Sequence, residues 1–485
     1  MTETPIRVAV IGSGPAGFYA AGHLLKESGA RLEVDMLERL PTPWGLVRSG
    51  VAPDHPKIKS VTRVYEKTAE HPRFRYFGNV TFGEHVGRED LLAHYHAIVY
   101  ATGSPSDRPL GIPGEELPGS HAATDFVGWY NGHPDQCELE IDLLSAERAV
   151  VIGNGNVAID VARMLVLAPA ELAPTDTADH ALEVLAASRV REVVIVGRRG
   201  PAQAAFTNPE LLELGELSEA DVIVDPDELE RALATPDPDA EANITSRRNV
   251  EILREYASRT PKGHAKRIIL RFLMSPTELL AGEHGRLGAV ELVRNELVQA
   301  DGSLRAKATD EHETIEAGLV FRAIGYRGIP LPGVPYDERG GVIPNDGGRV
   351  RDLQTGERVP GEYVVGWIKR GPSGVIGTNK KDAQETVDAM LADLLAPAED
   401  AAPRHEPAEP DAAAVESLLR ERQPELVTYA GWSEIDRHER ALGEPAGRPR
   451  VKLTRIDEML RVAASQGPSE ESLEEVEAGR GAPTR

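Results

Sequence analysis

Short apolar runs that end in glycine are the first pattern along the chain. The run from Val8 to Ile11 is rich in β-branched residues, and such a run predicts a buried strand. Glycines follow directly, and apolar residues then continue at spacings that suit a helix, from Phe18 to Leu25. The next apolar run, at residues 34–37, predicts a second strand. The pattern therefore predicts a strand–helix–strand unit at the start of the chain.

The glycines of this unit are Gly12, Gly14 and Gly17, in the spacing G-x-G-x-x-G. In dinucleotide-binding units the first glycine allows a tight turn, the second lets a pyrophosphate approach, and the third lets the helix pack on its strand. Amides at the helix start can then bind the phosphates. Glu38 ends the second strand about twenty residues further on, where a carboxylate can bond a ribose hydroxyl. The unit predicts a site for FAD or NAD without choosing between them.

The same pattern returns in the middle of the chain. An apolar run at 149–152 leads into Gly153 and Gly155, and Ala158 takes the position of the third glycine. Alanine is an accepted variant there, because the position serves close packing of helix on strand. A helix is expected over 159–165. The segment therefore predicts a second dinucleotide-binding unit.

The strand expected next in this second unit is Glu192–Gly197, and it ends in Arg198 and Arg199 instead of an acid. An acid at this place favours a free 2′-hydroxyl, whereas a guanidinium pair favours a 2′-phosphate. The strand lies farther from the glycines than usual, and residues 168–188 are interpreted as an inserted helical excursion. The pair predicts NADP binding, and a solvated surface pair is the alternative.

Each unit closes with a strand that ends in Ala-x-Gly, at Ala101–Gly103 and at Ala323–Gly325. Two units with matching closures imply duplicated dinucleotide domains. A further strand and glycine turn, from Glu362 to Asn379, lead into a helix expected over 382–395. Such a turn again offers backbone amides to a ligand.

The remaining segments are less regular. The Pro- and Gly-rich stretch 41–56 is either a structured loop packed over a cofactor or an ordinary packed connector. A helix is expected over 57–67 and a short strand within 80–86. Residues 210–266 look charged and loop-like, followed by a candidate strand at 268–272 and containing another at 222–224. This region carries the clearest basic cluster, which consists of Arg247, Arg248, Lys262, Lys266 and Arg267.

Composition narrows the class of protein. The 485 residues carry a formal charge of −24, which argues against a general binder of nucleic acid or anionic membranes. A single cysteine, Cys137, excludes an internal disulfide, a C-x-x-C redox pair and a cysteine-ligated iron–sulfur cluster within this sequence. No signal peptide and no apolar run long enough to span a bilayer are visible, so a cytoplasmic protein is expected. The oligomeric state stays open, with a monomer as the default, and no metal site is expected.

These motifs together resemble a known family. The resemblance rests on Gly12–Gly17, the loop 41–56, Gly153–Val157, Gly197–Pro201, and Gly366–Gly374 with Thr378–Lys381. In this order they are similar to the ferredoxin–NADP reductases of the adrenodoxin-reductase type, from about residue 5 to about residue 460. The family implies FAD on the first and last segments, NADPH on the middle one, and a separate ferredoxin as partner.

The resemblance also implies roles for individual residues. The FAD positions include Gly17, Glu38, Leu46, Val86, Trp367, Gly374, Val375 and Ile376. Gly366, directly before Trp367, is a further cofactor-binding candidate. The NADP positions include Arg108, Asn154, Gly155, Asn156, Val157, Arg198, Arg199, Glu210 and Gly374. His55 and Glu213 match a family pair placed near the nicotinamide and the flavin. The alternative for His55 is that it only packs the loop.

The expected chemistry follows from what the chain has and lacks. NADPH gives two electrons as a hydride, iron–sulfur proteins accept one at a time, and a flavin converts between them. Without C-x-x-C the dithiol route of thioredoxin reductases is closed, so electrons must pass directly to an external acceptor. His55, through Glu213, is a candidate to orient the nicotinamide or to manage a flavin proton.

Three alternatives remain at this level. A Baeyer–Villiger type flavin monooxygenase shares both fingerprints, but its signature is only partly matched at Phe126–Pro134. An electron-input subunit like that of glutamate synthase needs cysteine clusters that the chain lacks. A non-catalytic nucleotide-sensing protein would bind both nucleotides without turnover.

The expected fold is α/β, with two Rossmann-like domains of the glutathione-reductase-like type and a C-terminal extension. We expect an FAD-binding domain in two parts, 1–106 and 326–396, around an NADP-binding domain at 107–325. A linker at 397–411, a helical extension at 412–466 and a disordered acidic tail at 467–485 complete the prediction.

Overall fold

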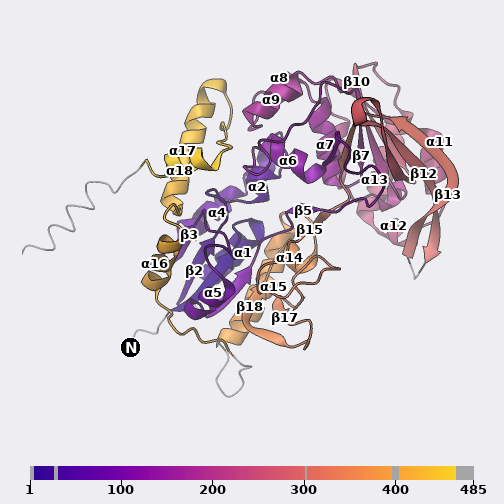
Figure 1. Cartoon of the computed structure of the whole chain (residues 1–485). Coiled ribbons are helices and arrows are strands. Elements are labelled where there is room, and N and C mark those ends of the chain that lie inside the picture. The colour runs from indigo at the N-terminus through magenta and orange to yellow at the C-terminus, as the bar shows by residue number, and fades with distance from the viewer. Residues whose placement is uncertain (1–4, 27–30, 301–302, 396–403, 466–485) are drawn as a thin grey trace, which may run out of the picture. The chain divides into compact units, whose positions relative to one another are not determined.

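The computed structural model describes residues 5–26, 31–300, 303–395 and 404–465 (Figure 1). The chain divides into two compact units. The first unit consists of Met1–Arg48, Pro56–Pro105 and Arg327–Arg485, and the second consists of Ser49–His55 and Ser106–Tyr326. The acidic tail expected at 467–485 and the first part of the expected linker, 397–403, lie outside the described residues.

A seven-stranded sheet of order β16-β17-β18-β4-β1-β2-β3 forms the centre of the first unit. The strands from β18 to β3 run parallel, and β16 and β17 add an antiparallel edge. They are β1 (Ile6–Ile11), β2 (Leu32–Leu37), β3 (Phe74–Phe77), β4 (Ala97–Tyr100), β16 (Asn345–Asp346), β17 (Arg349–Arg351) and β18 (Arg358–Val364). Strands that are apolar on both sides, such as β4, indicate a sheet covered on both faces.

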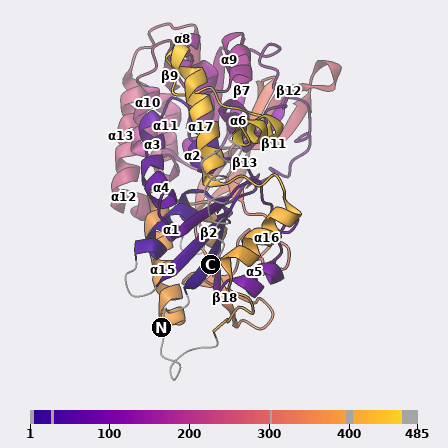
Figure 2. The ribbon, with the colours of Figure 1, turned by 90° about the vertical axis from the view of Figure 1, so that its left-hand side faces the viewer.

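Helices cover both faces of this sheet. Val8 and Val10 of β1 face α1 (Pro15–Lys26) and α15 (Thr378–Leu395), whereas Ala9 and Ile11 face α5 (Arg88–His94) and α16 (Ala412–Arg422). Figures 1 and 2 show α16 beside α5. The unit also contains α3 (Pro56–Lys59), α4 (Thr62–Ala69), α14 (Trp367–Arg370), α17 (Tyr429–Gly443) and α18 (Ile456–Ala463).

The second unit is built on a six-stranded parallel sheet of order β6-β14-β7-β8-β10-β9. The strands are β6 (Ser120–Ala122), β7 (Arg148–Ile152), β8 (Glu192–Gly197), β9 (Ala220–Val224), β10 (Lys266–Phe272) and β14 (Leu319–Arg322). One face packs against α6 (Ala123–Asn131), α7 (Asn156–Val166), α10 (Asn208–Leu214) and α13 (Ile244–Ser258). Phe126, the start of the partial monooxygenase signature, is buried in this core.

An antiparallel sheet of β11 (Met274–Ala281), β12 (Leu287–Ala300) and β13 (Ser303–Glu316) covers the other face of the second unit. Val150 and Val194 of the parallel sheet meet Val290 and Leu292 of β12 in a buried cluster. The shorter helices of this unit are α8 (Pro169–Leu172), α9 (Asp179–Ala186), α11 (Pro226–Leu233) and α12 (Pro238–Ala242). Three short elements lie at or near the boundaries between the units, namely α2 (Leu46–Ser49), β5 (Ser106–Asp107) and β15 (Tyr326–Arg327).

The α/β fold class and the strands around both fingerprints are confirmed. Several other predictions are wrong. The helix expected over 57–67 is split into α3 and α4. The strand expected within 80–86 is absent, since these residues form only a bridge between Phe82 and Val86, and the strand of this part of the chain is β3, which lies earlier. The region 210–266 is mainly helical, because its charged residues lie on the outer faces of α11 and α13.

The expected basic cluster is also wrong as a single group. Arg247 lies in the first turns of α13, and Ser258 ends that helix about 16 Å further along its axis, at 1.5 Å per residue. Lys266 and Arg267 then open β10 at the amino edge of the sheet, where Arg267 pairs with Glu192. Helix α13 therefore separates Arg247 and Arg248 from the other basic residues.

Candidate functional site

In the glycine turn after β1, the three glycines differ in what surrounds them. Gly12 has φ of +103°, and a Cβ there would lie 2.6 Å from the carbonyl oxygen of Ala101. A Cβ on Gly17 would lie 2.2 Å from the carbonyl oxygen of Gly12. A Cβ on Gly14 would meet nothing within 4 Å. The protein itself therefore requires glycine at two positions, and the free space over Gly14 fits a ligand such as a dinucleotide.

The turn after β7 repeats this division. Gly153 has φ of +133°, and a Cβ there would lie 2.2 Å from the carbonyl oxygen of Ala323. Ala158 is fully buried against the sheet. A Cβ on Gly155 would meet nothing within 4 Å, like one on Gly14. Both turns thus leave open space over the middle glycine, at the start of a helix.

Glu38 stands at the end of β2, beside the first glycine turn. Its carboxylate accepts hydrogen bonds from the amide of Ser13 at 3.0 Å and from the Ser13 hydroxyl at 2.6 Å. The other carboxylate oxygen accepts from the amide of Leu40 at 3.1 Å. These bonds fix the carboxylate at the carboxyl edge of the sheet, where dinucleotides bind.

Two guanidinium groups lie at the end of β8, beside the second turn. Arg198 is exposed and Arg199 is half-buried. The Asn295 side chain donates to the carbonyl of Arg198 at 2.9 Å, and the Leu273 amide donates to that of Arg199 at 3.2 Å. Burial and the neighbouring Arg198 lower the pKa of Arg199. An anion bound beside both groups would relieve the repulsion between them.

Asn154 and Asn156 fix the path of the chain around this turn. The carbonyl oxygen of Asn154 accepts from the amides of Ala205 and Phe206, and the Asn156 side chain accepts from the amide of Thr207 at 2.8 Å. Gly197 lies against the Asn154 side chain, since a Cβ there would come within 2.6 Å of its nitrogen. The second fingerprint and the end of β8 are therefore in direct contact.

His55 and Glu213 meet within the second unit, together with a residue that sequence reasoning missed. The Nε2 atom of His55 lies 2.8 Å from Glu213 Oε2 and 2.5 Å from Nη1 of Arg163. Arg163 also donates to Glu213 at 2.7 Å and to the carboxylate of Asp54. The imidazole Nε2 can therefore accept from Arg163 when unprotonated or donate to Glu213 when it carries a proton.

Polar atoms without protein partners surround this cluster. Asp160 Oδ1, Asp54 Oδ1, the Tyr130 hydroxyl and Glu210 Oε2 are buried and have no hydrogen-bond partner among the described residues. Burial raises the pKa of Asp160 to about 7, against the opposing effect of His55 and Arg163. A carboxyl with this pKa exchanges a proton near neutral pH. Buried polar groups normally have hydrogen-bond partners, so these atoms are consistent with a site where a polar ligand supplies the missing bonds.

The segment after β18 lies against the first glycine turn. A Cβ on Gly366, where φ is +78°, would lie 2.6 Å from the Cβ of Ala16, and the Gly366 amide donates to Asp382 at 2.6 Å. The Trp367 indole donates to the carbonyl of Ser373 at 3.2 Å. The Val375 amide donates to the Thr378 hydroxyl at 3.1 Å.

Other candidate residues have more varied surroundings. Leu46 and Val375 are 39% and 52% exposed, whereas Val86 is buried and Ile376 is partly buried. Arg108 is exposed, and its Nε donates to the carbonyl of Tyr326 at 3.3 Å. The first unit thus collects Gly12, Gly14, Gly17, Glu38 and Gly366, and the second unit collects Gly153–Val157, Arg198, Arg199, Glu210, Glu213 and His55.

Comparison with known proteins agrees with this arrangement. Residues 6–200 match the family model described as pyridine nucleotide-disulphide oxidoreductase. The chain is 55% identical over 465 residues to the NADPH-ferredoxin reductase FprA of Mycobacterium tuberculosis, covering 94% of this chain and 99% of that protein. It is 44% identical to human mitochondrial NADPH:adrenodoxin oxidoreductase, covering 95% of this chain and 92% of that protein.

The solved structure of Mycobacterium tuberculosis FprA in complex with NADPH superposes with a TM-score of 0.88 at 53% identity, covering 95% of this chain and 100% of that one. The chain belongs to the ferredoxin–NADP reductases of the adrenodoxin-reductase type. As a member of this family it is a flavoprotein oxidoreductase whose cofactors are FAD and NADPH. None of the helices in the described residues is long and apolar enough to cross a membrane.

Proposed function

We propose that this chain passes electrons from NADPH through FAD to a ferredoxin. The observation that carries the proposal is the pair of glycine turns with open space over Gly14 and Gly155, of which only the second is followed by two guanidinium groups. The names of the relatives support ferredoxin as the acceptor, and a relative from Mycobacterium bovis, 47% identical, is named as a probable ferredoxin/ferredoxin–NADP reductase. Bound FAD supplies the conversion of a two-electron donor into single electrons.

The FAD site belongs to the first unit in this proposal, with 1–106 and 326–396 as the FAD-binding domain. Gly14 admits the pyrophosphate, Glu38 binds a ribose hydroxyl, and the segment after β18 offers backbone amides. The proposed FAD residues are Gly12, Gly14, Gly17, Glu38, Leu46, Val86, Gly366, Trp367, Gly374, Val375 and Ile376.

The NADP site belongs to residues 107–325. Arg198 and Arg199 bind the 2′-phosphate, since charge-assisted hydrogen bonds to a phosphate are strong and geometrically specific. The open space over Gly155 supports its role at the pyrophosphate of NADPH. The proposed NADP residues are Arg108, Gly153, Asn154, Gly155, Asn156, Val157, Arg198, Arg199 and Glu210, and Gly374 completes the set.

His55 and Glu213 act at the reacting end of the nicotinamide in this proposal. Arg163 holds both side chains, because it donates to Glu213 and lies 2.5 Å from the His55 Nε2. The Nε2 atom can hold or release a proton between these two partners. Asp160, whose pKa burial raises to about 7, is a second group that can hold a proton beside them. These groups support proton exchange beside His55 and Glu213.

The acceptor has to approach a chain with a formal charge of −24, so a local positive surface is needed for a ferredoxin, which is typically acidic. Arg247 and Arg248 of α13 are the best candidates. Lys369 and Arg370 are only 10% and 19% exposed, and the carboxylate of Asp382 holds them at 2.9 and 3.2 Å. Arg248 also pairs with a carboxylate, Glu251 at 2.8 Å, but this ion pair is exposed and solvent weakens it, so Arg248 stays accessible to a partner. We place the protein in the cytoplasm as a monomer, where NADPH and ferredoxins are available.

A ferredoxin-reduction assay tests this function. NADPH-dependent reduction of a ferredoxin should be observed, and Arg247→Glu with Arg248→Glu should lower kcat/KM for ferredoxin at least about tenfold, because like charges oppose the encounter. Ferricyanide, which needs no protein docking, should lose less than about twofold. The matched control Arg259→Glu with Lys262→Glu reverses two charges at the far end of α13 and should leave both rates nearly unchanged.

Absence of ferredoxin reduction by the unaltered protein would contradict the proposed function. Equal loss with both acceptors would place the damage in NADPH binding or folding. Full activity of the Arg247 and Arg248 variant would move the docking surface elsewhere.

A further inference from the structure

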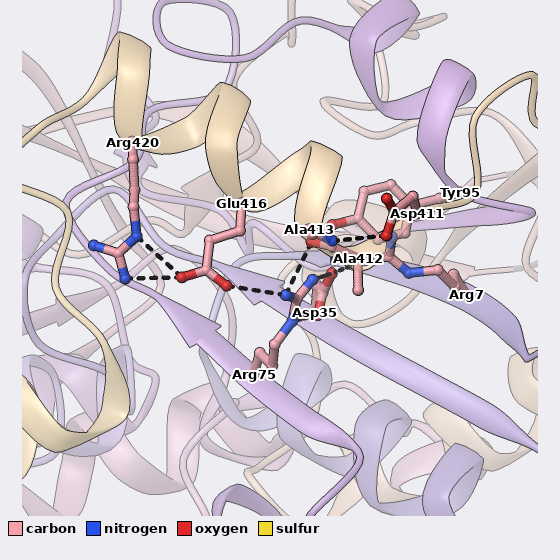
Figure 3. Close-up of polar contacts among 9 residues, drawn as sticks. All are labelled: Arg7, Asp35, Arg75, Tyr95, Asp411, Ala412, Ala413, Glu416 and Arg420. Carbon is pink, nitrogen blue, oxygen red and sulfur yellow. Dashed lines mark hydrogen bonds and ion pairs between the residues drawn. The ribbon is translucent and has the colours of Figure 1, made fainter. Parts of the chain in front are cut away.

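The C-terminal extension, of which residues 412–465 are described, contacts the rest of the first unit at several places, including an ion pair between Arg422 and Asp90 at 2.6 Å. Three of these contacts involve β3 and Arg48. At the first, the Arg75 guanidinium donates to Glu416 of α16 at 3.2 Å and to the carbonyl of Ala412 at 3.1 Å, and it also binds Asp35 at 2.6 Å (Figure 3). At the second, Val427 and Gly78 exchange two backbone hydrogen bonds of 2.7 and 2.8 Å. These two contacts attach the extension to β3 and its end.

The third attachment joins α17 to Arg48. Glu439 accepts from the two terminal nitrogens of Arg48 at 2.8 and 2.5 Å, across 391 residues of sequence. Glu439 is fully buried and Arg48 is 7% exposed. The amide of Leu453 and Arg450 also donate to Glu439, at 2.9 and 3.1 Å. Lys452 donates to the carbonyl oxygen of Arg48 at 3.0 Å, so the extension holds both ends of this residue.

Arg48 lies in the short helix α2, and the segment Trp44–Arg48, called the loop Trp44–Arg48 below, packs on the first glycine turn. Trp44 has φ of +84°, a conformation that bulky residues rarely adopt. Its amide donates to the carbonyl of Ser13 at 3.1 Å, and a Cβ on Gly45 would lie 2.8 Å from the Cα of Gly14. The loop Trp44–Arg48 therefore lies directly against the backbone of Ser13 and Gly14.

An aromatic contact completes the connection from the extension to this loop. The Trp432 ring of α17 meets the Trp44 ring edge-on, with centroids 6.2 Å apart, and the Arg48 guanidinium lies 5.3 Å from the Trp432 ring. Phe18 also packs on Trp44, at 4.6 Å between centroids. A backbone conformation as unfavourable as that of Trp44 persists only where surrounding contacts hold it, and Trp432 and Arg48 supply such contacts.

Stability alone does not account for a buried ion pair here, because well-packed apolar side chains often serve a core equally well. We propose that the C-terminal extension is part of the FAD site: Glu439 acting through Arg48, and Trp432 acting through Trp44, hold the loop Trp44–Arg48 in the conformation that keeps the space over Gly14 open for the FAD pyrophosphate. The inference rests on the proposed assignment of Gly14 to FAD. Glu439 and Trp432 are positioning residues, since they act through Arg48 and Trp44.

The test compares Glu439→Gln with the matched variant Glu416→Gln, which removes a pair from the same extension away from the loop. The readout is the dissociation constant of FAD, measured from free flavin after dilution. Glu439→Gln should weaken FAD binding at least about tenfold, which corresponds to about 1.4 kcal/mol. Glu416→Gln should weaken it less than about fivefold, because the Arg75–Glu416 pair is partly exposed. Binding of 2′-phospho-AMP to the second unit should be unchanged in both variants.

Thermal unfolding with and without FAD separates positioning from stability. Because FAD stabilises only the state that binds it, weaker binding should lower the midpoint of FAD-loaded Glu439→Gln more than that of the FAD-free protein. Equal lowering of both midpoints, or unchanged FAD affinity, would overturn the inference. Should Glu439→Gln not fold, Trp432→Leu keeps the ion pair and should show the same loss of affinity, and unaltered affinity there would overturn it. An unaltered protein that binds no FAD would instead overturn the proposed function.

Discussion

At the scale of single residues, Arg198 and Arg199 distinguish the second nucleotide site from the first. Both follow a fully buried strand, and their carbonyl oxygens accept hydrogen bonds from Asn295 of β12 and from Leu273, which lies between β10 and β11. Replacing both with alanine should raise the KM for NADPH on the order of a hundredfold, because each charged hydrogen bond contributes about 1.5–3 kcal/mol. The KM for NADH should change less than about threefold, since NADH lacks the phosphate.

Steady-state kinetics with both nucleotides on the same variant check this prediction. Parallel loss with NADPH and NADH would mean that the arginines support the fold or attract anions in general.

The residues of the site differ in how far sequence can predict them. Gly12, Gly14 and Gly17 were predictable because the local geometry of one strand–turn–helix unit determines their spacing. His55 and Glu213 came only from the resemblance to a family. Arg163 and Asp54 were missed, because their contact joins positions 109 residues apart that only the tertiary fold brings together. The local signal was the presence of two charged residues, Asp160 and Arg163, within the otherwise largely apolar helix α7.

At the scale of elements, the two strand–turn–helix units offer a matched pair of substitutions. A Cβ on Gly14 or on Gly155 meets nothing within 4 Å, so valine should fit the folded protein at either position and fill the space of the ligand. Gly14→Val should therefore lower FAD content at least about tenfold and leave 2′-phospho-AMP binding intact, because the backbone can no longer approach the pyrophosphate. Gly155→Val should instead weaken 2′-phospho-AMP binding and leave FAD content intact.

Flavin absorbance of the purified variants and calorimetric titration with 2′-phospho-AMP measure the two effects. A Gly14→Val protein with stoichiometric FAD would show that the first turn does not hold the flavin.

Elements with a clear hydrophobic pattern in the sequence were predictable. Elements whose structure depends on packing against distant segments were not. The buried strands β4 and β8 are apolar throughout, which allowed their assignment from sequence. The antiparallel sheet β11–β12–β13 was missed because β13 alternates charged and small residues that pack only on one side. Helix α13 was interpreted as a loop because its buried residues are few and its outer face is charged.

At the scale of the whole molecule, the chain uses one design twice and adds a C-terminal extension. The boundaries of the FAD and NADP domains stay predictions, although the compact units begin and end close to them. Composition excluded internal cysteine chemistry, because one cysteine cannot form a dithiol. The sequence did not predict the attachment of α17 to Arg48, because this contact depends on packing between distant segments.

The central claim is that this chain binds FAD and reduces it with NADPH. The most direct measurement is the visible spectrum of the purified protein, followed under anaerobic conditions during titration with NADPH and, separately, with NADH. The account predicts flavin absorbance bands that bleach with about one equivalent of NADPH and respond far less to NADH, since Arg198 and Arg199 favour the 2′-phosphate. A protein without flavin bands, or flavin bands that NADPH leaves unchanged, would contradict it.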